Sequence, residues 1–98
     1  MYARVTMTNV QPDKVNEAIS LWRDSVVPAA RQQKGFKGGY LLTDRSTGKG
    51  IAIGLWETEA DLKASGEASP FFREQIAKFA GLLTGAPVIE NYEVSVQA

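Results

Sequence analysis

The N-terminal residues alternate between hydrophobic and polar side chains. Residues 2–9 place Ala3, Val5 and Met7 on one face and mostly polar side chains on the other. This period of two predicts a β-strand with one apolar face and one mixed face.

A long helix is predicted from Pro12 to about Gln33, because the apolar positions return at helical spacing and proline suits the first turn. Pro28 lies inside it, lacks an amide donor and crowds the carbonyl of Asp24, so we expect a kink near Asp24. Gly35 ends the helix. The apolar stripe consists of Val15, Ala18, Ile19, Trp22 and Val26.

Two strands rich in aromatic and branched residues are predicted next, over 36–43 and 51–57. The polar segment 44–50 joins them as the turn of a β-hairpin. In the second strand, Trp56 shares one side with small residues, Ala52 and Gly54, which leaves room for a cavity. The alternate residues are expected to pack on the helices: Ile51, Ile53 and Leu55.

The C-terminal part predicts two helical pieces and a last strand. Thr58 is an N-cap, and Gly66 closes that short helix. Ser69-Pro70 starts a second helix, which is expected to continue until Gly85. Residues 88–96 supply the final strand.

The predicted order is that of an α+β, ferredoxin-like βαββαβ fold formed by one domain, residues 1–98. Strand order 4-1-3-2 in a four-stranded antiparallel sheet, with both helices on one face, satisfies the right-handed crossover rule. The other face carries large side chains such as Trp56 or Tyr92, so we expect it to be covered by a second copy of the chain in a homodimer.

Charge and composition narrow the choice of partners and location. Lys plus Arg and Asp plus Glu number 11 each, without a basic run, which argues against nucleic acid as a partner. No stretch approaches the roughly 18 apolar residues of a membrane span, and the first residues lack a signal-peptide pattern. A cytoplasmic location, with no membrane partner, is therefore expected.

The chain has no Cys and no His. A thiolate or imidazole metal site, a Cys nucleophile and a Ser-His-Asp relay are thereby excluded. The acidic residues are scattered singly, so no metal and no cofactor are expected.

Several short motifs resemble the antibiotic biosynthesis monooxygenase family of dimeric α/β-barrel proteins. They are Val27-Pro28-Ala29-Ala30-Arg31, Gly35, Gly38-Gly39-Tyr40, Leu55-Trp56-Glu57-Thr58 and Ser69-Pro70-Phe71-Phe72. The resemblance covers nearly the whole chain and implies a ligand cavity between sheet and helices.

The resemblance also implies a range of activities, including cofactor-independent oxygenation of quinols or polycyclic phenols and haem degradation. Many members carry a His nine residues after the tryptophan, and here Ser65 occupies that position. The helix that would supply a haem ligand has no imidazole either, which disfavours haem.

The candidate ligand pocket comprises Arg4, Thr6, Tyr40, Trp56, Ser65 and Phe72. Arg4 and Thr6 can hold a phenolate oxygen, although Arg4 can instead pair with Glu90 or Glu93 of the last strand. Tyr40 is a candidate proton donor. Trp56 is either a cavity wall or a core or interface anchor.

Phe71 and Phe72 are candidates to wall a pocket. Because Phe72 belongs to a helix stripe and Phe71 does not, the favoured expectation is one of them in the core and the other at the dimer contact. No catalytic residue is assigned.

The sequence therefore leads to a homodimeric protein that binds a small apolar or aromatic molecule, with cofactor-free monooxygenation as the leading hypothesis. The alternatives are a non-catalytic ligand-binding or accessory module and an isomerase or lyase acting on a lactone-like substrate.

Overall fold

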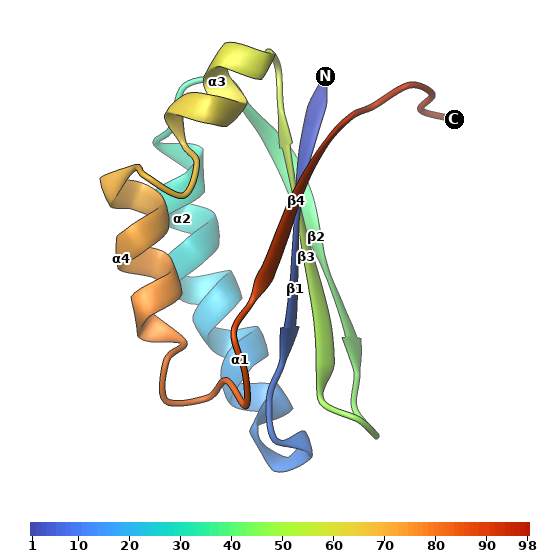
Figure 1. Cartoon of the computed structure of the whole chain (residues 1–98), viewed down its shortest axis with the longest axis vertical. Helices are drawn as coiled ribbons and strands as arrows, with labels where there is room; N and C mark the ends of the chain where they lie inside the picture. The colour runs from blue at the N-terminus through green and yellow to red at the C-terminus, as the bar shows by residue number, and fades with distance from the viewer.

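The computed structural model describes all 98 residues as a four-stranded antiparallel sheet with every helix on one face (Figure 1). The sheet order is β2-β3-β1-β4, which confirms the predicted ferredoxin-like topology. The strands are β1 (Tyr2–Asn9), β2 (Phe36–Asp44), β3 (Lys49–Trp56) and β4 (Val88–Glu93). The helical elements are η1 (Pro12–Lys14), α1 (Val15–Leu21), η2 (Trp22–Val26), α2 (Val27–Arg31), α3 (Glu59–Ala64) and α4 (Pro70–Lys78).

The first long helix is continuous but irregular where Pro28 perturbs it. The segment η2 is a π-helical turn centred on Asp24, four residues before the proline. There, the amide of Val27 donates to the carbonyl of Trp22, five residues back. The wider turn accommodates the proline at the place where the sequence predicts a kink.

The two C-terminal helices begin at the predicted caps. The Thr58 hydroxyl accepts a hydrogen bond from the amide of Asp61 at 3.0 Å, and the Ser69 hydroxyl accepts one from the amide of Phe72 at 3.1 Å. Both satisfy amides that the first helical turn leaves free.

Both C-terminal elements are shorter than the sequence suggests. Helix α4 ends at Lys78, because the following residues turn back to β1, where the amide of Thr84 donates to the carbonyl of Asn9 at 2.8 Å. Strand β4 ends at Glu93, because Glu93 already lies opposite Tyr2, the first residue of β1. Beyond it, the amide of Val94 still donates to the carbonyl of Met1 at 2.9 Å.

The strand register assigns each side chain to one face of the sheet. Arg4 lies opposite Gly54, and Thr6 lies opposite Ala52, on the face that the helices cover. Successive residues of a strand point to opposite faces, so the odd-numbered residues of β3 point away from the helices. The expectation that Ile51, Ile53 and Leu55 pack on the helices is therefore wrong, although Ile53 also borders the cavity. Trp56 lies on the covered face and is 2% exposed, so placing it on the open face is wrong as well.

A β-bulge in β2 determines where Tyr40 points. Phe36 pairs with Trp56, but Gly38 pairs with Leu55, which leaves Lys37 as the extra residue. The bulge reverses the alternation, so Tyr40 lies on the open face and is 61% exposed. Without the bulge, Tyr40 would share the helix-covered face with Phe36.

We predict that Gly35→Ala destabilises the protein by about 1–3 kcal/mol, because Gly35 has φ +81° and an added Cβ would overlap the side chain of Asp61. Gly81→Ala is the matched control, since its φ is not positive and nothing lies within 4 Å of an added Cβ. Urea unfolding of both variants measures the difference. Equal free energies of unfolding for the two variants would show that the backbone at position 35 does not require glycine.

Candidate functional site

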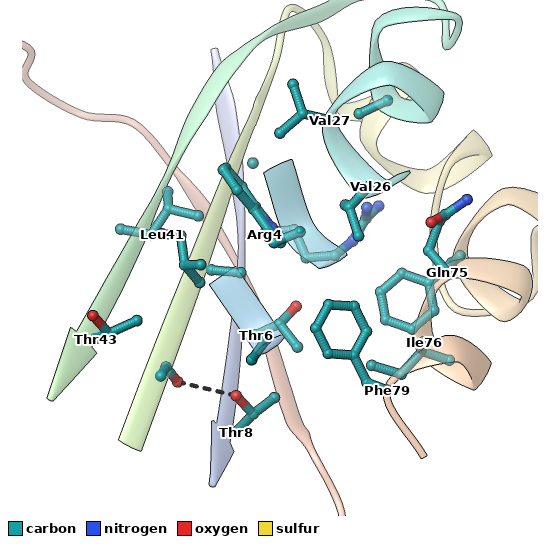
Figure 2. A pocket seen from close by; sticks show the side chains of 18 of the residues that line it. Arg4, Thr6, Thr8, Val26, Val27, Leu41, Thr43, Gln75, Ile76 and Phe79 are labelled. Atoms are coloured by element: carbon teal, nitrogen blue, oxygen red, sulfur yellow. Dashed lines mark hydrogen bonds between the residues drawn. The ribbon is translucent and has the colours of Figure 1, made fainter. Parts of the chain in front are cut away.

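A cavity of about 130 Å³ lies between the sheet and the helices (Figure 2). The helix-facing residues of β1, β2 and β3 line one side, and residues of α1, η2, α2 and α4 line the other. Most of these side chains are apolar. The sheet contributes Arg4, Thr6, Thr8, Phe36, Leu41, Thr43, Ala52 and Trp56, and the helices contribute Val15, Ala18, Trp22, Val26, Val27, Ala30, Phe71, Phe72, Gln75, Ile76 and Phe79.

Two charged side chains, Arg4 and Lys49, belong to this mostly apolar lining. Lys49 is exposed, whereas Arg4 is buried, at only 6% exposure. Its Nη2 donates to the carbonyl of Leu62 at 2.5 Å and to the hydroxyl of Ser65 at 3.1 Å, both at the end of α3. No carboxylate forms an ion pair with it. Burial lowers the pKa of Arg4, an effect that the charge of Glu67 partly offsets.

Aromatic rings surround the guanidinium. The Arg4 Cζ lies 5.4 Å from the ring centroid of Trp56 and 5.5 Å from that of Phe72. Trp56 in turn makes edge contacts with Phe36, at 5.3 Å between centroids, and with Phe71, at 6.3 Å. Cation–π attraction to these rings compensates part of the lost hydration of the charge.

The indole nitrogen of Trp56 has no hydrogen-bond partner, although Trp56 is only 2% exposed. It is the single fully buried side-chain nitrogen or oxygen left unpaired in the protein. A Cβ added to Gly54 would lie 3.4 Å from Nε1, so the indole N–H lies over this glycine. Gly54 is also the cross-strand neighbour of Arg4, which places both donors in the same part of the cavity.

The remaining polar groups of the lining are mostly neutral. Thr8 donates a long hydrogen bond of 3.5 Å to the carbonyl of Gly50, as Figure 2 shows. Gln75 accepts a hydrogen bond from Ser25 at 2.9 Å, which ties α4 to the π-helical turn. No Asp, Glu, His or Tyr side chain lines the cavity, and exposed Lys49 is its one amine.

Four of the six residues singled out from the sequence line the cavity: Arg4, Thr6, Trp56 and Phe72. Ser65 is 2% exposed and lies behind Arg4, not in the lining. Tyr40 is not part of the site, because the bulge turns it to the open face.

Arg4 does not pair with Glu90 or Glu93. It lies opposite Asn91, and its polar contacts are with α3. The alternative role of Arg4 as half of a cross-strand ion pair is therefore wrong.

Phe71 and Phe72 both line the cavity, which agrees with the alternative that they wall a pocket and not with one core residue and one dimer-contact residue. Sequence reasoning also missed Phe36 and Gln75. The helical spacing of Trp22 and Val26 indicated from the sequence that both side chains are buried. It did not indicate that they border a ligand cavity. No sequence signal distinguishes a helix face that fills a core from one that borders a cavity.

None of the helices combines the length and hydrophobicity that crossing a bilayer requires. No three His, Cys, Asp or Glu side chains are grouped as ligands for a metal ion.

Comparison by sequence identifies relatives in Mycobacterium tuberculosis, while no known family model matches. The chain is 35% identical over 95 residues to "Uncharacterized protein Rv2557" of strain ATCC 25618 / H37Rv, a match that covers 97% of this chain and 41% of the relative. It is 33% identical over 96 residues to "Uncharacterized protein Rv2558" of the same strain, a match that covers 98% of this chain and 39% of the relative. The chain thus spans about two fifths of the length of these relatives.

Comparison by structure identifies full-length matches. "Crystal structure of antibiotic biosynthesis monooxygenase" has a TM-score of 0.74 at 16% identity and covers 98% of this chain and 100% of that one. Rv0793 from Mycobacterium tuberculosis has a TM-score of 0.75 at 18% identity, covering 99% and 97%. NE2512 from Nitrosomonas europaea, a protein of unknown function, has a TM-score of 0.78 at 18% identity, and the match covers 99% of this chain and 91% of that one. These likenesses show a shared fold.

We predict that Arg4→Met leaves the free energy of unfolding within about 1 kcal/mol of the wild type or raises it. The buried cation has no carboxylate partner, and the Ser65 hydroxyl still donates to the carbonyl of Leu62 at 3.0 Å once Arg4 is gone. Urea unfolding, with exposed Arg73→Met as the control, measures the effect. A decrease of about 3 kcal/mol in the free energy of unfolding would instead show that the contacts of Arg4 stabilise the folded protein.

Proposed function

Because this chain has the fold of the structure described as an antibiotic biosynthesis monooxygenase, we propose that it is a member of that family. In this proposal it is a homodimer that binds one small aromatic molecule in each subunit. It oxidises that molecule with molecular oxygen, without a metal or a flavin.

The observation that carries this proposal is a mostly apolar cavity with one buried cation, Arg4, in its lining. Apolar walls with a few placed polar groups are typical of small-molecule sites. A dry cavity of roughly 150 Å³ is known to bind benzene. At about 130 Å³, this cavity suits a single aromatic ring better than a polycyclic phenol.

A hydroquinone supplies every electron that the reaction needs. Four electrons and two protons leave the substrate as oxygen is consumed, one oxygen atom enters the ring, and the other becomes water. The products are a hydroxyquinone and water, so no external reductant is required.

The residues of the cavity favour the reactive form of such a substrate. Electron transfer to oxygen is easier from a hydroquinone anion than from the neutral molecule, and the Arg4 cation stabilises the anion. The lining offers no carboxylate or imidazole to take the proton, so the substrate loses it to solvent on binding. The aromatic walls formed by Phe36, Phe71 and Phe72 exclude water from the bound ring.

A second candidate is a non-catalytic module that only sequesters an aromatic metabolite. The absence of a carboxylate, an imidazole or a tyrosine from the lining favours it. The same observation weighs against an isomerase or lyase, because proton abstraction from a lactone-like substrate needs a positioned base.

The dimer is proposed from the uncovered face of the sheet. Tyr40 is 61% exposed, Leu42 49%, Val88 54% and Tyr92 50%. The single chain exposes 5984 Å², more than the roughly 5,500 Å² typical of a compact monomer of this mass. A second copy that covers this face would bury these side chains in a self-complementary contact.

We predict that metal-stripped protein consumes oxygen with one-ring hydroquinones and that heavy oxygen gas labels the hydroxyquinone at one position. Trp56→Ala and Arg4→Ala should each lower the rate by about 10-fold or more, since both remove cavity groups. The control is Tyr40→Phe, which lies outside the cavity. Ligand-induced stabilisation without any oxygen uptake would support the binding module instead.

We predict a dimer by analytical ultracentrifugation at micromolar concentration. Leu42→Asp should convert it to monomer, because a carboxylate on the open face cannot be buried without a partner. Ala77→Asp, an exposed position on the helical side of the molecule, is the matched control and should remain dimeric. A wild-type monomer would contradict the proposed interface.

A further inference from the structure

We propose that the ligand of this cavity carries an oxyanion and that Arg4 and the indole N–H of Trp56 bind that oxyanion together. This inference rests on the proposed ligand-binding function and adds the chemical class of the ligand. It holds whether the ligand is oxidised or only bound.

The first argument is the incomplete hydrogen bonding of Arg4. Of its three guanidinium nitrogens, only Nη2 donates to protein acceptors, namely the Leu62 carbonyl and the Ser65 hydroxyl. Arg4 lines the cavity and is 94% buried, yet no Asp or Glu lies within ion-pair distance. A buried cation without a counter-charge is unfavourable, and an anionic ligand would supply the missing charge.

The second argument is the unpaired donor of Trp56. An indole nitrogen can only donate, so a buried N–H without an acceptor leaves its hydrogen-bonding capacity unused. Gly54 has no side chain to cover this N–H, and Gly54 lies directly across the strand pair from Arg4. Two donors, one of them charged, thus have bonding capacity left in one part of a mostly apolar cavity.

Ser65 acts as a positioning residue in this arrangement. Its hydroxyl contacts Nη2 of Arg4 at 3.1 Å and the carbonyls of Asp61 and Leu62 at 3.1 and 3.0 Å. These contacts hold one edge of the guanidinium against α3. The other nitrogens, Nε and Nη1, are left for an acceptor from the cavity.

The walls limit what can carry the oxyanion. Rings of Phe71 and Phe72 and the apolar side chains of the helices surround the donors, so the body of the ligand is flat and apolar. The volume of about 130 Å³ admits one ring. A monocyclic phenolate and an aromatic carboxylate share this chemistry, and the experiment separates them.

The test uses 4-nitrophenol, whose phenolate form is yellow, and 4-nitroanisole, which has nearly the same shape but no acidic proton. Absorbance titration against pH gives the pKa of protein-bound 4-nitrophenol. We expect wild-type protein to lower that pKa by about one unit or more, because a tenfold preference for the anion equals one unit. Binding of 4-nitrobenzoate in parallel shows whether a carboxylate is accepted as well as a phenolate.

The variants assign the effect to the two donors. Arg4→Met and Trp56→Phe should each weaken binding of the nitrophenolate by about 10- to 100-fold, which is the usual loss for a hydrogen bond to a charged group. Binding of 4-nitroanisole should weaken much less in both variants, so the preference for the anion over the neutral ring falls. Ser65→Ala should weaken binding of the nitrophenolate by a smaller factor and leave binding of 4-nitroanisole unchanged. Tyr40→Phe should leave the affinity for both compounds unchanged.

Two outcomes would overturn the inference. If 4-nitroanisole binds and 4-nitrophenol keeps its free pKa, the cavity binds aromatic rings without selecting an anion, and the proposed function survives alone. If neither compound binds to protein that circular dichroism shows to be folded, the proposed function fails as well.

Discussion

Placing every helix on one face of a four-stranded sheet is the constraint on which the rest of this structure depends. The helices bury one face only, and the pleat of each strand then sorts every side chain into one of two environments. On the covered face, small residues such as Ala52 and Gly54 leave a cavity between sheet and helices. On the open face, large side chains such as Tyr40 and Tyr92 remain exposed.

The cavity contains two polar groups whose bonding capacity the protein itself satisfies only in part. Arg4 is buried without a carboxylate, and the nitrogen of Trp56 is buried without an acceptor. A core selected for stability alone would contain neither, since one is a cation without a counter-charge and the other is a donor without an acceptor. Such departures from good packing are expected at binding sites, where a ligand supplies the missing partners.

Much of the fold could be predicted from the sequence because its signals are local. Alternation predicted β1, Thr58 and Ser69 predicted the starts of α3 and α4, and Pro28 predicted the irregular turn at η2. The ends of α4 and β4 were predicted too late in the chain. They depend on pairing with β1, a partner about 80 residues away along the chain.

The site was predictable only in part, for a related reason. The sequence by itself determined that a charged residue, Arg4, and a tryptophan, Trp56, belong to neighbouring strands of one sheet, and that no imidazole or thiol chemistry is available. Only the tertiary structure decided which face carries them, because the choice of face follows from where the helices pack. It also decided that Tyr40 lies on the open face, since a single-residue bulge reverses the alternation in β2. That bulge depends on pairing with β3 and not on local sequence.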